Sequence, residues 1–114
     1  MDIRLELISN DNKEIINISD VKNPNAFEYS DSYGAKNLLR IFNNGIDIDR
    51  VASTHSTSIK LRENEKSFVT VTSNEGIIKI DIKTLAFERN NGIITLVYSI
   101  NEEEKAIRIY YIGV

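Results

Sequence analysis

Residues 76–114 read GIIKIDIKTLAFERNNGIITLVYSINEEEKAIRIYYIGV, and this stretch decides the fold. β-Branched and aromatic residues alternate in it with polar ones, and turn-forming segments at 90–92 and 101–104 interrupt the alternation. A period of two is typical of antiparallel strands with one buried face. The stretch therefore predicts consecutive β-strands joined by hairpins.

Turn chemistry predicts the register of these strands. Asn91 and Gly92 suit a type I′ turn, because both of its central residues need a positive φ. This turn predicts Phe87 opposite Leu96 and Leu85 opposite Tyr98. A loop over residues 101–104 predicts three further facing pairs, which are Tyr98 with Ile107, Leu96 with Ile109, and Ile94 with Tyr111.

The rest of the chain repeats the pattern. Apolar and polar residues alternate over 2–9, 14–18 and 27–31, and again over 46–51, 58–62 and 67–72. Residues 35–44 also fit a helical spacing, but Asn44-Gly45 and the alternation after it favour a hairpin. A turn there predicts Leu39 opposite Arg50. A change of phase near residues 83–85 indicates a bend or a β-bulge.

About ten short strands with turns every 8 to 12 residues are typical of all-β barrels and sandwiches. Sequential hairpins favour an antiparallel up-and-down β-barrel. The chain has 114 residues and shows no linker or internal repeat, so residues 1–114 are expected to form a single β-barrel domain.

Composition excludes several classes of function. The chain carries 14 basic and 17 acidic residues, a formal charge of −3, which predicts no nucleic-acid or membrane partner. It contains no cysteine and one histidine, so we expect no metal site and no cofactor. Neither a catalytic motif nor a signal peptide is recognisable, and we expect a cytoplasmic protein that is not an enzyme.

The order of elements from Tyr29 onward resembles the YwiB-type family of small bacterial β-barrel proteins. The features that carry this resemblance are turn residues and strand patterns: Gly34, IDIDR at 46–50, SIKL at 58–61, TSNEG at 72–76, KTL at 83–85 and GIITLVYSI at 92–100. The resemblance covers roughly the last three quarters of the chain. It implies a lipocalin-like (calycin-like) barrel in the cytoplasm of a Gram-positive type bacterium, and it supplies no catalytic residue.

Four side chains form the candidate ligand-binding set, namely Arg50, His55, Thr57 and Tyr98. His55 and Thr57 share the spacing of Ile59 and so point inward, and the hairpin register also turns Arg50 inward. A polar ring of this kind at the mouth of a barrel would bind an anionic or hydrogen-bonding ligand. The alternative is that these side chains lie near strand ends and reach water.

Arg50 distinguishes the two readings. The inward positions offer no Asp or Glu as its partner, so the sequence predicts that Arg50 lies near a barrel end, with hydroxyl or carbonyl acceptors. It follows that Arg50→Met should leave folding nearly intact or slightly improved.

The leading hypothesis is a non-enzymatic barrel that binds a small molecule in its interior, although large inward side chains favour a filled lumen. The rival hypothesis is a protein-interaction or structural module, including a homodimer. It rests on an exposed Tyr/Ile face of the C-terminal strands, formed by Ile93, Val97, Arg108, Tyr110 and Ile112.

Overall fold

The structure, a computed structural model, describes residues 1–112, so the last two residues of the expected C-terminal strand lie outside it. Ten antiparallel strands form one sheet in the order β2-β1-β10-β9-β8-β7-β6-β5-β4-β3. They are β1 (Asp2–Ser9), β2 (Asn12–Ile18), β3 (Ala26–Ser30), β4 (Lys36–Phe42), β5 (Gly45–Val51), β6 (His55–Arg62), β7 (Ser67–Ser73), β8 (Gly76–Asn90), β9 (Ile93–Ile100) and β10 (Glu103–Ile112).

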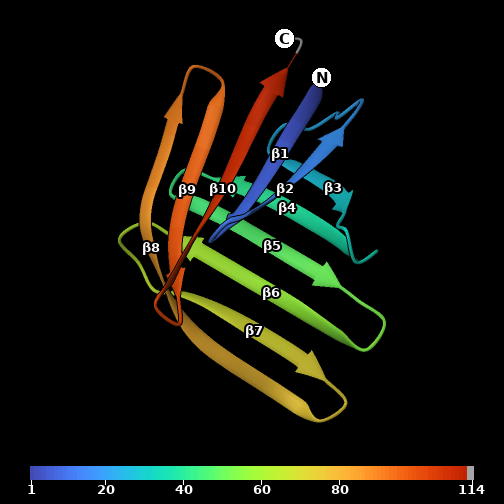
Figure 1. The fold of residues 1–114 in the computed structure, drawn as a ribbon, viewed down its shortest axis with the longest axis vertical. Coiled ribbons are helices and arrows are strands. Elements are labelled where there is room, and N and C mark those ends of the chain that lie inside the picture. Colours follow the sequence, from blue (N-terminus) through green and yellow to red (C-terminus); the bar gives the residue numbers. More distant parts are fainter. Residues whose placement is uncertain (113–114) are drawn as a thin grey trace.

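The sheet curls into a nearly closed barrel (Figure 1). Neighbours in sequence are neighbours in the sheet from β3 to β10, as an up-and-down topology requires, and β1 then pairs with β10. β2 and β3 are consecutive in the chain, yet they form the two edges of the sheet. The barrel is therefore interrupted between β2 and β3.

The predicted all-β class is confirmed, and residues 36–42 form a strand rather than a helix. Asn91 and Gly92 have φ values of 52° and 76°, which fits the predicted type I′ turn, and Phe87 lies opposite Leu96. A β-bulge lies between Thr84 and Ala86. Figure 1 shows β8 bending as it passes from β7 to β9.

The bulge corrects one predicted pair, since Thr84 rather than Leu85 lies opposite Tyr98. The register of β9 with β10 is also wrong in the sequence prediction. Asn101 and Glu102 have φ values of 50° and 66° and form a two-residue turn, which is shorter than the predicted loop. Tyr98 therefore lies opposite Lys105, not Ile107. The shift is two residues, so the same side chains still face the core.

The β4–β5 hairpin differs from its prediction in the same way. Asn43 and Asn44 form the turn, and Gly45 begins β5, so Arg50 lies opposite Asn37 rather than Leu39. A Cβ on Gly45 would lie 1.7 Å from the carbonyl oxygen of Leu61 on β6. Gly45 is thus required by the close approach of two strands, and the Asn-Gly pair misled the turn assignment.

Inward side chains from both halves of the sheet fill the middle of the barrel. Leu5, Leu39, Ile46, Leu96 and Ile109 are completely buried. Side chains therefore fill the middle of the barrel, as expected, whereas one end of it is hollow. No helix in residues 1–112 is long and apolar enough to cross a membrane.

Candidate ligand-binding cavity

A cavity of about 700 Å³ lies at one end of the barrel, between the β2/β1/β10/β9 side and the β3–β6 side. The floor of the cavity is apolar and is formed by the core side chains nearest to that end of the barrel. Ile48 and Ile59 face each other on β5 and β6, and Leu7 and Ile107 do so on β1 and β10. The volume falls within the range of small-molecule sites.

Above this floor, the sheet register places one polar row on each wall. The first, which we name the Arg50 wall, follows the pairing of Tyr29 with Asn37 and of Asn37 with Arg50 on β3, β4 and β5. The second, the Lys105 wall, follows from β9 to β2 and consists of Tyr98, Lys105, Ser9 and Asn12. Glu14, which lies opposite Leu7, adds a carboxylate one layer deeper on β2.

The Arg50 wall is held by Asp31, the residue that follows β3. Arg50 Nε donates to Asp31 Oδ2 at 2.7 Å, and Asn37 Nδ2 donates to the same oxygen at 3.1 Å. The other carboxylate oxygen accepts the backbone N–H groups of Tyr33 (3.0 Å) and Ala35 (3.1 Å). Burial raises the pKa of Asp31, but these hydrogen bonds outweigh it and lower the pKa to about 2.

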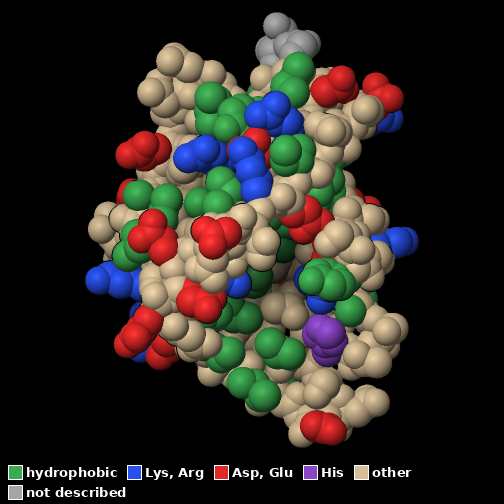
Figure 2. All heavy atoms as spheres, in the orientation of Figure 1, with side chains coloured by type: hydrophobic (Ala, Val, Ile, Leu, Met, Phe, Trp, Pro, Cys, Tyr) green, Lys and Arg blue, Asp and Glu red, His purple; other side chains and the backbone are tan. Residues whose placement is uncertain are grey.

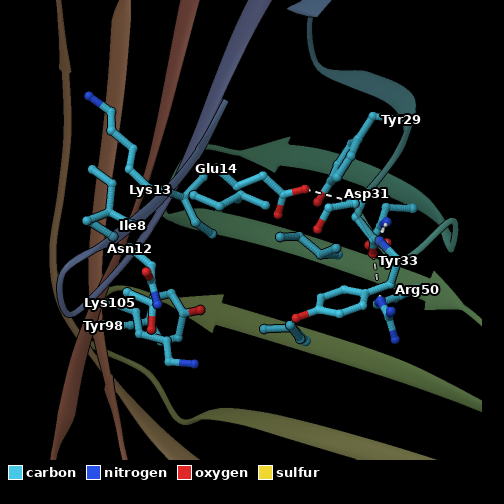
Figure 3. Close-up of a pocket in the computed structure, with 18 residues that line it drawn as sticks. Ile8, Asn12, Lys13, Glu14, Tyr29, Asp31, Tyr33, Arg50, Tyr98 and Lys105 are labelled. Carbon is cyan, nitrogen blue, oxygen red and sulfur yellow. Dashed lines mark hydrogen bonds and ion pairs between the residues drawn. The ribbon is translucent and has the colours of Figure 1, made fainter. Parts of the chain in front are cut away.

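Asp31 and Glu14 also fix the β3–β4 loop across the interruption of the barrel. Glu14 Oε1 accepts the backbone N–H of Ser32 at 2.7 Å, which ties β2 to the loop. Gly34 takes a φ of 80° in this loop. Tyr33 remains 87% exposed although it lines the cavity. Figure 3 shows the Tyr33 ring reaching across the cavity toward the side that carries Tyr98 and Lys105.

The phenols of Tyr29 and Tyr98 face the cavity, and neither has an internal hydrogen-bond partner within residues 1–112. Burial, together with the carboxylates of Asp31 and Glu14, raises the pKa of Tyr29. Burial also raises the pKa of Tyr98. Both side chains therefore stay protonated at neutral pH and can donate a hydrogen bond to a ligand.

The structure brings two residues of the candidate set, Arg50 and Tyr98, to the cavity, on opposite walls. His55 lies next to Arg50, with Nε2 3.3 Å from Arg50 Nη1, but does not itself line the cavity. Thr57 lies opposite Arg50 on β6 and does not line it either. Figure 2 shows the single histidine at the surface, among scattered acidic and basic side chains.

One expectation for Arg50 is wrong. The sequence offered no carboxylate for it, yet Asp31 is within hydrogen-bond distance and its side chain is only 9% exposed. The alternation after Phe27 placed Asp31 at the end of the predicted third strand. In the structure that strand ends at Ser30, and Asp31 lies in the following loop, where its side chain faces the cavity. An Asp beside Ser-Tyr-Gly is a signal for a side-chain-stabilised turn, and this signal could have identified it.

Sequence reasoning also missed Lys105 and Glu14. Lys105 was hidden by the error in the β9–β10 register, because a two-residue shift replaces Ile107 with Lys105 beside Tyr98. Glu14 marked the start of the predicted second strand, but its inward position depends on the β1–β2 pairing. Within residues 1–112, no group of three or more His, Asp or Glu side chains is arranged so that it could hold a metal ion.

The C-terminal face named in the rival hypothesis is partly covered. Tyr110 lies under the guanidinium of Arg4, 4.6 Å from the ring centroid, and its hydroxyl donates to Glu6 at 3.2 Å. Glu6 is fully buried beneath Arg4, Lys13 and Tyr110. Burial raises its pKa, but hydrogen bonds and the charge of Lys13 produce a net lowering. Ile112 is 46% exposed.

Comparison with solved structures shows the fold. The chain is similar to the crystal structure of the YwiB protein from Bacillus subtilis, with a TM-score of 0.61 and 12% sequence identity over 99% of this chain and 91% of that one. No family model matches the sequence, and no curated protein matches it. At this identity the likeness establishes a YwiB-like barrel and nothing about activity.

Proposed function

We propose that the protein binds a small molecule at the hollow end of its barrel. The observation that carries this proposal is the cavity of about 700 Å³, which combines an apolar floor with several polar side chains, among them Tyr98 and Lys105, that have no partner within residues 1–112. A concave apolar surface with a few convergent hydrogen-bonding groups is the usual form of a small-molecule site.

The chemistry of the cavity favours binding over catalysis. Its one histidine neighbour, His55, contacts Arg50 and the Thr54 hydroxyl, and neither His55 nor Thr54 lines the cavity, where a substrate would have to lie. We therefore propose a non-enzymatic carrier or sensor of the lipocalin-like type. The net charge of −3 supports the absence of nucleic acid and of anionic membranes among its partners. We also propose a cytoplasmic, bacterial protein on the strength of the YwiB resemblance, and cell fractionation tests this location.

A thermal-shift screen of metabolites tests the proposal, followed by calorimetry on the compounds that raise the melting temperature. Ser9→Trp should fill the cavity from the Lys105 wall and abolish binding. The matched control is Ser58→Trp on the outer face of β6, opposite Asp49. Equal binding by both variants, or no stabilising compound in a broad library, would contradict the proposal.

The rival function is a protein-interaction module, with pairing of two copies through β9 and β10 as one form of it. It is the weaker proposal because Tyr110 is already engaged by Arg4 and Glu6. Light scattering tests it: a monomer at high micromolar concentration contradicts a homodimer.

A further inference from the structure

The charged groups around the cavity differ in whether they have a counter-ion. Among the cations that line it, Lys13 lies 3.3 Å from Glu6 and Arg50 lies 2.7 Å from Asp31. Lys105 makes neither an ion pair nor a side-chain hydrogen bond within residues 1–112. One cation of the cavity is therefore left without a partner among residues 1–112.

The carboxylates show the same division. Asp31 accepts four hydrogen bonds, including one from Arg50, so its charge is compensated. Glu14 accepts only the backbone N–H of Ser32, through Oε1, and has no cationic partner within the described residues. The cavity thus carries one uncompensated positive charge and one uncompensated negative charge.

The charges of Lys105 and Glu14 lie on the same wall of the cavity but are separated from each other. Lys105 lies on β10 in the polar row, whereas Glu14 lies on β2, two strands away and one layer deeper. Strand spacing and rise place their Cα atoms about 12 Å apart in a flat sheet. Figure 3 shows Lys105 beside Tyr98 and Glu14 directed toward Tyr29 and Asp31.

Both side chains are half-buried in a concave site, where the surrounding protein screens a charge less than open water does. A ligand with charges opposite to theirs would compensate both. The apolar floor of Leu7, Ile48 and Ile59 lies beside them and matches an aliphatic body.

We propose that the ligand is an amphipathic zwitterion, with an apolar body, an anionic group at Lys105 and Tyr98, and an ammonium group at Glu14. This inference rests on the proposed function and specifies its ligand class. The Tyr98 hydroxyl donates to the anionic group beside the Lys105 ammonium. The free oxygen of Glu14 accepts from the ligand amine, while Oε1 keeps its bond to Ser32.

Calorimetry with a matched probe series tests this ligand class. The probes share one aliphatic chain and are ω-aminooctanoate, octanoate, octylamine and octanol. The wild-type protein should bind ω-aminooctanoate about tenfold more tightly than octanoate or octylamine, because each end gains a charge-assisted hydrogen bond.

Two variants that remove a charge test which residue binds each charged group of the ligand. Lys105→Gln should remove the advantage of ω-aminooctanoate over octylamine, and Glu14→Gln its advantage over octanoate. Glu14→Gln retains an oxygen acceptor for Ser32, so the loop stays tied. The controls are Lys60→Gln and Glu28→Gln, which remove one charge of each sign from exposed positions outside the cavity.

The outcomes separate this inference from the proposed function. Equal affinity for all four probes, or preference for octanoate alone, overturns the zwitterion while leaving a small-molecule site in place. No binding by any probe also overturns it, and the metabolite screen with Ser9→Trp then decides the proposed function on its own. Loss of affinity in the control variants would show that net charge, not the cavity, controls binding.

Discussion

The two walls of the cavity contrast in how they treat charge. On the Arg50 wall, the guanidinium, Asp31 and Asn37 satisfy one another. On the Lys105 wall, the ammonium of Lys105 has no counter-ion within residues 1–112. Polar residues at a similar depth in the cavity can therefore have different roles. The first wall holds the β3–β4 loop in place, whereas the second, in our proposal, presents charge to a ligand.

The largest expected effect on stability comes from a substitution that disturbs the pairing of β5 with β6, the strands next to the Arg50 wall. Gly45→Ala should lower the free energy of unfolding by about 3 kcal/mol, because the new Cβ collides with the Leu61 carbonyl and forces β5 away from β6. Chemical denaturation measures this change. Gly76→Ala is a comparison, since a Cβ there meets nothing within 4 Å and only its φ of 127° is strained. An unchanged midpoint for Gly45→Ala would contradict the close strand approach.

The next effect concerns Asp31. Its pKa falls from 3.8 to about 2 on folding, so its ionised form stabilises the protein by about 2 kcal/mol at neutral pH. Because the folded pKa is the lower one, this stabilisation is complete above pH 4 and is lost as the pH falls toward 2. Asp31→Asn should remove about 2 kcal/mol at pH 7 and little at pH 2.

Unfolding measured from pH 2 to pH 7 checks this dependence. The control is Asp49→Asn, which breaks the exposed ion pair with Arg40 and should cost less than about 0.5 kcal/mol at any pH. A constant difference between Asp31→Asn and the wild type across this range would exclude the ion pair as its source.

A smaller effect is expected for Arg50→Met. The sequence alone predicted nearly intact folding, but the part-buried pairing with Asp31 changes that expectation to a loss of about 1 kcal/mol. Asp31 keeps Asn37 and two backbone donors, so the loss is less than that of Asp31→Asn. A double-mutant cycle between Asp31 and Arg50 measures the coupling directly. Additive losses would show that the two residues act independently.

The smallest effect on stability is expected for Lys105, and it tests the difference between the two walls. Lys105→Gln should change the free energy of unfolding by less than about 0.5 kcal/mol, because no group in the described part of the chain forms an ion pair with Lys105. Thermal denaturation without ligand measures it. A loss as large as that of Arg50→Met would mean that Lys105 supports the fold, and the two walls would then be alike.

The sequence predicted the fold well because alternation reports which face of a strand is buried. It predicted register less well, since a two-residue shift leaves the buried face unchanged and turn length must decide. That shift concealed Lys105 beside Tyr98. Asp31 was missed for a different reason: the Ser-Tyr-Gly segment after it indicates a turn, but Asp31 lies 19 residues from Arg50, and a local turn signal does not show that the two side chains meet.

We propose that a ligand occupies the space in front of the Lys105 wall. Proton–nitrogen correlation NMR spectra recorded during titration with ω-aminooctanoate test this proposal. We expect shifts concentrated at Tyr98, Lys105, Glu14 and Tyr33, with Tyr fluorescence changing in parallel, since three of the five tyrosines line the cavity. Shifts confined to the outer face around Tyr110 and Ile112, or none at saturating probe, would contradict it.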